Sequence, residues 1–240
     1  MAVACLPEIN TERRKELNKF QHSVGIKFKS LELLNLAFIH RSFSNEARAK
    51  VNASNERLEF LGDAILGAVT ASLLYEILSD SSEGELAKIK SIVVSEETLS
   101  GIARELQIDT MMVLGHGEEL SGGRDKRALL ADALEALFGA LYLDSGFKAA
   151  FDFTCDCIKP EIAKVRENRG KEDYKSHLQE VCQRKFKMFP SYKLSKFSGP
   201  EHARHFWIEV TCGGKTFGPG MGKSKKNAEQ EAARIALLNL

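Results

Sequence analysis

Residues 55–66 read NERLEFLGDAIL and residues 131–141 read ADALEALFGAL, and these two stretches decide the fold. On an α-helix of about 3.6 residues per turn, Glu56, Glu59 and Asp63 share one face. Asp132 and Glu135 form a second pair, spaced for neighbouring turns of a helix. Both groups lie within apolar runs, at the expected edge of a core, where carboxylates repel one another and take up protons unless a cation neutralises them. A hard divalent metal is therefore the expected ligand.

Helical periodicity dominates the N-terminal part of the chain. Helices are expected at residues 11–23, 31–40, 55–78, 84–94, 95–106, 126–144 and 147–165. Ser95 is expected to cap the helix that follows it. Residues 115–119 and 121–124 are rich in glycine and polar side chains, which is typical of loops. Since strand-like alternation is almost absent, the sequence predicts an all-α domain over residues 1–165.

The pattern changes after residue 165. Residues 166–173 are charged and nearly free of apolar side chains, which indicates a linker. Beyond it the sequence predicts an α+β domain over residues 174–240, in the order α-β-β-β-α. Its helices are expected at residues 174–186 and 224–239, and its strands at residues 192–197, 203–211 and 215–217.

The overall net charge of +1 hides an asymmetry between the two parts. Residues 171–240 contain 13 Lys and Arg against 7 Asp and Glu, which leaves 21 basic and 26 acidic residues in the rest of the chain. An acidic part joined to a basic part indicates a metal-using or scaffold domain followed by a domain that binds a polyanion.

The five cysteines fit no zinc-finger spacing, so reduced structural thiols in a cytoplasmic protein are expected. Neither a membrane-spanning apolar run nor a secretory leader is evident, so no membrane association is expected.

Several motifs occur in an order that resembles the ribonuclease III family. They are residues 55–66, 84–90 (GELAKIK), 114–118 (LGHGE), 121–124 (SGGR) and 130–137 (LADALEAL). The C-terminal part resembles a double-stranded RNA-binding domain. Its motifs are residues 173–176 (DYKS), 178–180 (LQE), 199–202 (GPEH) and 222–226 (GKSKK).

The resemblance implies a magnesium-dependent endoribonuclease, with Mn²⁺ able to substitute, that cuts both strands of an RNA duplex. It implies 5′-phosphate and 3′-hydroxyl ends with short 3′ overhangs, and processing of ribosomal and other structured precursor RNAs. It also implies a homodimer formed through the catalytic domain, and no small-molecule organic cofactor. The alternatives are a catalytically silent regulator that binds double-stranded RNA, a structural component of a ribonucleoprotein, and a two-metal DNA nuclease.

By the same resemblance, Glu59, Asp63, Asp132 and Glu135 match the metal-binding carboxylates of the family. Glu59 and Glu135 are expected nearest the metal, and Asp63 and Glu135 to act in catalysis, with Asp63 orienting water. Glu56 either lines the dimer and RNA valley or supports the first turn of its helix. Phe60 is either a dimer contact or a core phenylalanine.

Two histidines, His40 and His116, are expected to be structural, because a metal-bound water needs no general base. In the second domain, the resemblance assigns RNA contacts to the first helix, the first strand–strand loop and the start of the last helix. These residues are Ser176, Gln179, Glu180, Gln183, His202, Lys223, Lys225 and Lys226.

Overall fold

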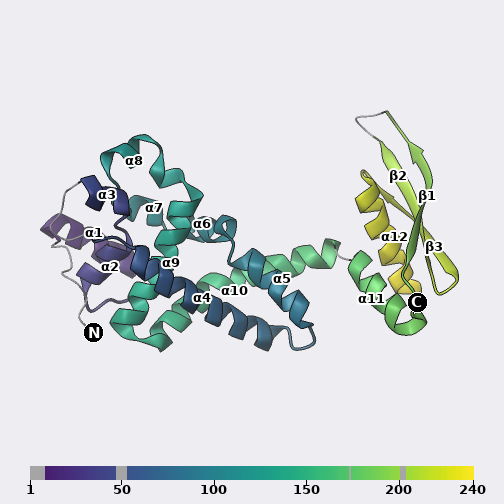
Figure 1. Ribbon diagram of the computed structural model, residues 1–240, viewed down its shortest axis with the longest axis horizontal. Coiled ribbons are helices and arrows are strands. Elements are labelled where there is room, and N and C mark those ends of the chain that lie inside the picture. The colour runs from purple at the N-terminus through teal and green to yellow at the C-terminus, as the bar shows by residue number, and fades with distance from the viewer. Residues whose placement is uncertain (1–8, 47–52, 173, 201–203) are drawn as a thin grey trace. The chain divides into compact units, whose positions relative to one another are not determined.

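The computed structural model describes residues 9–46, 53–172, 174–200 and 204–240. The chain divides into two compact units, Met1–Val165 and Arg166–Leu240 (Figure 1). The described part of the first unit is helical, and the second carries a three-stranded sheet. The predicted fold class, an all-α domain followed by a small α+β domain, is confirmed.

The first unit is built from ten α-helices and one short 3-10 helix in the part of the chain that is described. They are α1 Thr11–Ser23, α2 Leu31–Ala37, α3 Arg41–Glu46, α4 Glu56–Ile77, α5 Glu83–Val93, α6 Glu96–Glu105, α7 Ile108–Met111, α8 His116–Leu120, η1 Gly123–Asp125, α9 Arg127–Ser145 and α10 Phe147–Glu172. As expected, the Ser95 side chain caps α6, accepting a hydrogen bond from the backbone N–H of Thr98.

Several sequence-based assignments in this unit are wrong, and the helix predicted at residues 31–40 ends at Ala37. The segments at residues 115–119 and 121–124 form the short helical turns α8 and η1 instead of open loops. Helix α10 also continues beyond residue 165, as far as Glu172. Charged residues such as Arg, Glu and Lys are good helix formers, so a polar composition by itself does not end a helix.

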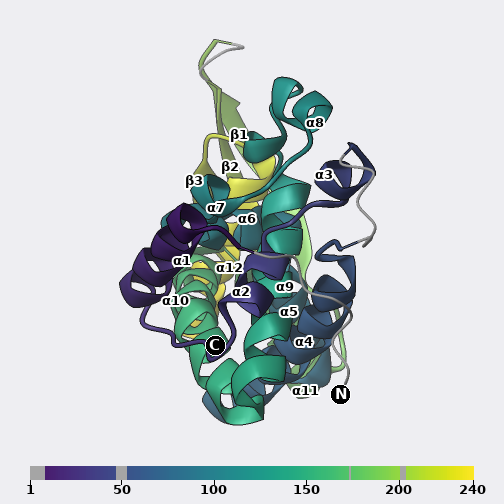
Figure 2. The ribbon, with the colours of Figure 1, turned by 90° about the vertical axis from the view of Figure 1, so that its left-hand side faces the viewer.

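Helices α4 and α9 lie side by side and form the centre of the first unit (Figures 1 and 2). They meet through two glycines, Gly62 of α4 and Gly139 of α9. A Cβ atom on Gly62 would overlap the backbone carbonyl of Glu135, and one on Gly139 would overlap the carbonyl of Leu58. The two backbones therefore touch directly, and each glycine is required by its neighbour's main chain.

Apolar side chains complete the core around this crossing. Leu66 and Val69 of α4 and Leu134 and Phe138 of α9 are fully buried. Helix α4 is the one helix in the described part that is long and apolar enough to cross a membrane. Eight of its residues, among them Leu58, Leu66, Val69 and Leu74, are buried in the unit.

The second unit consists of α11 Tyr174–Phe186, β1 Ser191–Ser198, β2 His205–Cys212, β3 Lys215–Gly222 and α12 Lys225–Asn239. The strands form an antiparallel sheet in the order β1-β2-β3. Strand β3 is longer than the three residues predicted. Its C-terminal residues Gly220 and Gly222 lie against the backbone of α12, at a distance that leaves no room for a Cβ atom.

The core of the second unit contains a disulfide between Cys182 of α11 and Cys212 of β2, with Cα atoms 6.1 Å apart. The expectation of reduced thiols is therefore wrong for this pair. Packing of α11 on the sheet brings together two buried sulfurs that no spacing rule connects. Cys155 and Cys157 of α10 are free, and burial raises the pKa of the Cys157 thiol to about 12, which favours its protonated form.

We predict that Gly62→Ala destabilises the protein by about 3 kcal/mol, because its methyl group forces α4 away from the Glu135 carbonyl. Gly67→Ala is the matched control on the same helix. Its Cβ would meet only the Lys90 ammonium, at 3.6 Å, so relief of glycine's entropy cost should leave stability equal or higher. Urea unfolding of both variants measures the difference. Equal stability of the two would show that the α4–α9 contact tolerates separation.

Candidate metal and RNA-binding sites

Three of the predicted carboxylates converge where α4 crosses α9. Glu59 of α4 and Asp132 and Glu135 of α9 each offer an oxygen, and these oxygens all lie within 4.8 Å of one another. All three side chains are partly buried. The close glycine contact between the helices is what allows the acids to approach, because Gly62 lies three residues after Glu59 and contacts Glu135 itself.

Asp63 lies beside this group but is not part of it. Its side chain is exposed, and its charge raises the pKa of Glu135. The structure therefore gathers three of the four predicted metal ligands into one cluster. It leaves Asp63 one helical turn beyond Glu59, at the solvent side.

The cluster is electrostatically strained in the absence of a cation. Burial, followed by the charges of Asp63, Asp132 and Glu59, raises the pKa of Glu135 to about 7. Burial also raises the pKa of Glu59 and that of Asp132. Three oxygen donors that repel one another at this spacing fit a hard divalent cation, which prefers oxygen ligands and would remove the repulsion.

Arg41, at the start of α3, lies near the cluster. The sequence analysis did not identify this residue. Its guanidinium lies 3.3 Å from a carboxylate oxygen of Glu56, and its charge lowers the pKa of Glu59 and of Asp132 against the effect of burial. Glu56 itself is exposed and also accepts a hydrogen bond from Ser54. The pair Arg41–Glu56 therefore lies at the rim of the cluster, and Glu56 provides none of its converging oxygens.

The start of α4 is fixed by a buried asparagine. The backbone N–H of Asn55 donates to the carbonyl of Ile39 at 2.8 Å, and its side-chain amide donates to the carbonyl of Ala37 at 3.3 Å. These bonds hold the chain before α3 against the first turn of α4, which carries Glu56 and Glu59. Asn55 opens the motif in the sequence, but only its burial shows that it positions the acids.

His40 and His116 both take part in local hydrogen bonding. The His40 ring nitrogen Nδ1 lies 2.8 Å from the Ser42 hydroxyl, and burial lowers the pKa of this ring. The backbone N–H of His116 donates to Glu46 at 2.6 Å. Neither residue belongs to the carboxylate cluster.

Phe60 follows Glu59 but points away from the core. Its side chain is 82% exposed, so the alternative of a core phenylalanine is wrong.

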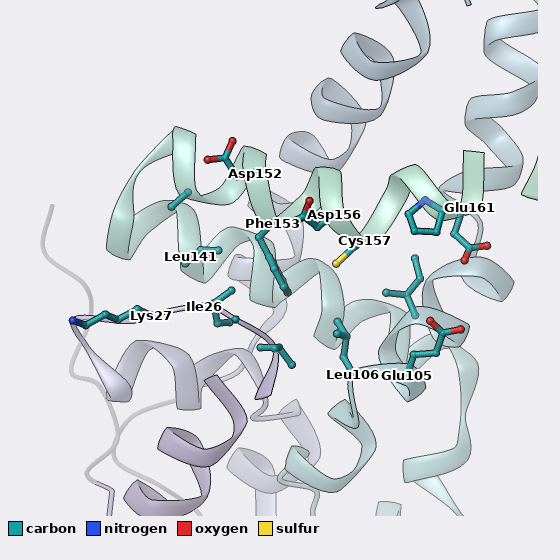
Figure 3. Close-up of a pocket in the computed structure, with 15 residues that line it drawn as sticks. Ile26, Lys27, Glu105, Leu106, Leu141, Asp152, Phe153, Asp156, Cys157 and Glu161 are labelled. Atoms are coloured by element: carbon teal, nitrogen blue, oxygen red, sulfur yellow. The ribbon is translucent and has the colours of Figure 1, made fainter. Parts of the chain in front are cut away.

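A cavity of about 560 Å³ lies elsewhere in the first unit (Figure 3). Ile26, Leu106 and Phe153 contribute apolar surface to it, and Asp156 and Glu161 of α10 are among its acidic residues. None of the predicted site residues lines it. The candidate catalytic site is therefore the carboxylate cluster at the helix crossing and not this cavity.

The second unit presents its predicted RNA contacts on two elements. Gln179, Glu180 and Gln183 are exposed on α11, on the side away from the buried residues Leu178 and Cys182, and Ser176 is exposed as well. His202 lies outside the described residues.

The predicted lysines lie at the start of α12. Lys223, Lys225 and Lys226 are exposed, and the Ser224 side chain caps the helix by accepting from the backbone N–H of Asn227. Exposed cations beside the free backbone N–H groups of a helix N-terminus form a surface that suits an anion.

Fold and sites together define a class of protein: a helical domain with an acidic, metal-compatible cluster, joined to a small basic α+β domain. Two family models match the chain. The Ribonuclease-III-like model covers residues 30–162, and the double-stranded RNA binding motif covers residues 174–240.

Curated relatives match nearly the whole chain. The protein named Ribonuclease 3 from Treponema denticola is 55% identical over 232 residues, covering 97% of this chain and 94% of the relative. Ribonuclease 3 from Treponema pallidum is 50% identical, covering 95% and 90%.

Among solved structures, the nuclease domain of ribonuclease III from Campylobacter jejuni is 36% identical, with a TM-score of 0.56, covering 61% of this chain and 95% of that one. A second structure of that domain, described for flexibility in a region involved in dimer formation, is 35% identical, with a TM-score of 0.56, and covers 60% and 97%.

The chain belongs to the ribonuclease III family. It is a double-strand-specific endoribonuclease, of a family that depends on divalent metal. The resemblance drawn from the motifs is confirmed.

We predict that the metal-free protein loses stability as the pH rises from about 4.5 to about 7. Glu135 has a raised pKa in the folded protein, so the folded state binds more protons than the unfolded state in this window. The loss should be on the order of 1 kcal/mol, after allowance for solvent screening of a half-exposed group. Melting temperatures of wild type and Glu135→Gln in chelator measure it, and the variant should show a flatter profile. If melting temperature varied with pH in the same way for both proteins, a raised pKa of Glu135 would not be the cause of the loss.

Proposed function

We propose that the cluster of Glu59, Asp132 and Glu135 binds Mg²⁺ and is the site at which RNA duplexes are hydrolysed. The observation that supports this most directly is the convergence of three carboxylate oxygens within 4.8 Å across two helices. Mn²⁺ should substitute, because it accepts the same oxygen ligands. The products would carry 5′-phosphates and 3′-hydroxyls with short 3′ overhangs.

The residues divide the chemistry between them. Glu59, Asp132 and Glu135 would hold the cation, which would neutralise phosphate charge and lower the pKa of water. Glu135 must give up its proton to bind, so the site is best formed above its pKa of about 7. Asp63, which is exposed at the solvent side of the cluster, would accept a hydrogen bond from the attacking water. Arg41 holds Glu56 at the rim.

The second unit would hold the duplex. A-form RNA offers its minor groove and 2′-hydroxyls to side chains, and the polar residues Gln179, Glu180 and Gln183 suit that surface, with the carboxylate of Glu180 accepting from a 2′-hydroxyl. Ser176 and His202 are proposed as further contacts to the duplex. Lys223, Lys225 and Lys226, at the positive end of α12, would contact phosphates across the intervening major groove.

The catalytic domain is proposed to act as a homodimer, with Phe60 in the contact between subunits. The exposed ring supports this, since association would remove it from water. Each subunit would then cleave one strand of the duplex. Light scattering of the purified protein tests the assembly, and a mass of one chain would contradict it.

In the cell we propose a cytoplasmic enzyme that processes ribosomal and other structured precursor RNAs. The alternative of a catalytically silent duplex-binding regulator would require the loss of a metal carboxylate. All four predicted acids, Glu59, Asp63, Asp132 and Glu135, are present in this chain.

We predict that Glu135→Gln lowers cleavage of a long RNA duplex in Mg²⁺ by at least about 100-fold, because the cluster loses a charged ligand. Glu76→Gln, an exposed position on the same α4 helix as Glu59, should cleave like wild type. Single-turnover cleavage with duplex in excess of its dissociation constant separates chemistry from binding. Equal rates for the two variants would refute the role of Glu135, and an inactive wild type that still binds duplex would favour the regulator.

A second prediction concerns the lysines of α12. Lys225→Ala combined with Lys226→Ala should weaken duplex binding and reduce the slope of log affinity against log salt by about one to two, since each lysine neutralises one phosphate. Lys215→Ala, an exposed lysine at the start of β3, is the matched control. Duplex binding is measured by anisotropy across a salt series without metal. An unchanged slope in the double variant would show that these lysines do not bind phosphate.

A further inference from the structure

The sheet of the second unit has one face that none of the described residues covers. Along β2, Ile208, Val210 and Cys212 are buried against the helices. Side chains alternate along a strand, so Trp207 and Glu209, which flank Ile208, lie on the opposite face. Helices α11 and α12 contact the sheet and each other on the buried side (Figure 1).

Four residues from three strands form a patch on this open face, here called the outer-face patch: Lys196, His205, Trp207 and Met221. Lys196 of β1 and Met221 of β3 are the direct cross-strand partners of Trp207. The Lys196 ammonium lies 5.4 Å from the centre of the Trp207 ring, and the His205 ring centre lies 6.4 Å from it. Met221 is 54% exposed. The patch is thus aromatic at its centre and cationic at one side.

The charge of this face is predominantly positive. Lys193 and Lys196 are exposed, and among the described residues neither forms an ion pair. Glu209, the cross-strand partner of Lys193, is the carboxylate that the described strands place here, and it accepts a hydrogen bond from Ser195 at 3.3 Å. A solvated face of an antiparallel sheet ordinarily carries polar side chains, so a partly exposed indole beside lysines without a described ion pair is a candidate binding surface.

The proposed duplex contacts do not use this patch. Those on described residues lie on α11 and at the start of α12, whereas the outer-face patch lies on the other side of the sheet from those helices. The patch also has different chemistry. A duplex hides the faces of its bases and offers phosphates and groove edges, while an indole with adjacent cations matches an unpaired base followed by its phosphate.

We propose that the outer-face patch binds single-stranded RNA, with a base stacked on Trp207 and phosphates held by Lys193 and Lys196. Lys196 would leave the indole for the phosphate, exchanging one weak interaction for a charge-assisted one. The occupant of this kind that a duplex-cutting enzyme meets is the unpaired flank of a structured RNA. The inference rests on the RNA-binding function of the second unit and not on the carboxylate site.

Trp207 is the single tryptophan of the chain, so its fluorescence reports on the patch directly. A short single-stranded oligouridylate, added to the full-length protein in metal-free buffer, should quench the emission in a saturable way. A blunt RNA duplex should leave most of the emission intact, although it binds the protein. Catalysis is not needed, so failure of the carboxylate proposal would not affect the outcome.

Variants separate stacking from charge. Lys193→Ala with Lys196→Ala keeps the probe and should weaken oligouridylate binding, lowering its salt slope by about 0.7 for each phosphate that is no longer neutralised. Lys215→Ala is the matched control and should titrate like wild type. With a labelled oligouridylate, Trp207→Ala should weaken binding roughly fivefold or more, while Trp207→Phe, which retains a ring, should lie near wild type. Unchanged duplex affinity verifies that each variant is folded.

Three results would overturn the proposal. Absence of quenching by oligouridylate would show that the patch does not meet bases. Equal quenching by heparin, which has charge but no bases, would reduce the effect to general attraction for polyanions. Quenching that depends on protein concentration and not on RNA would identify the patch as a contact between copies of this chain.

Discussion

The direct contact between the backbones of α4 and α9 is the constraint on which the first domain depends. Gly62 and Gly139 let each helix press against a carbonyl of the other, and side chains of any size there would separate them. The same contact positions the proposed metal site. Glu59 lies one turn before Gly62, and the carbonyl that Gly62 meets belongs to Glu135. Close packing and convergence of the acids are therefore one feature of the molecule.

The convergence brings negative charges close together, and their repulsion favours the binding of a cation. Three carboxylates at the edge of a core hold their pKa values above normal, and the pKa of Glu135 reaches about 7. A site that repels itself when empty gains more from a divalent cation than a relaxed one would. Arg41, at the rim, offsets part of the repulsion without entering the cluster.

The RNA-binding unit also has small residues at the positions where two backbones meet. Gly220 and Gly222 of β3 lie directly against α12, whose buried residues are alanines such as Ala228 and Ala232. These contacts place α12 on one face of the sheet, where the buried residues of α11 share its core, and the other face stays open. The unit consequently has two chemically distinct surfaces, one suited to phosphates and grooves, the other centred on Trp207.

The sequence by itself determined the order of the long helices and of the strands, the division into an acidic and a basic part, and the acids on each helix face. Those features follow from local periodicity and from motifs that are contiguous in the chain. It could not determine that Asp63 lies outside the cluster, that Arg41 joins its rim, or that Cys182 meets Cys212. Each of these is a distance between residues far apart in sequence, or a direction around a helix fixed by packing. Only the tertiary structure, through the glycine-mediated approach of α4 to α9 and the packing of α11 on the sheet, decided them.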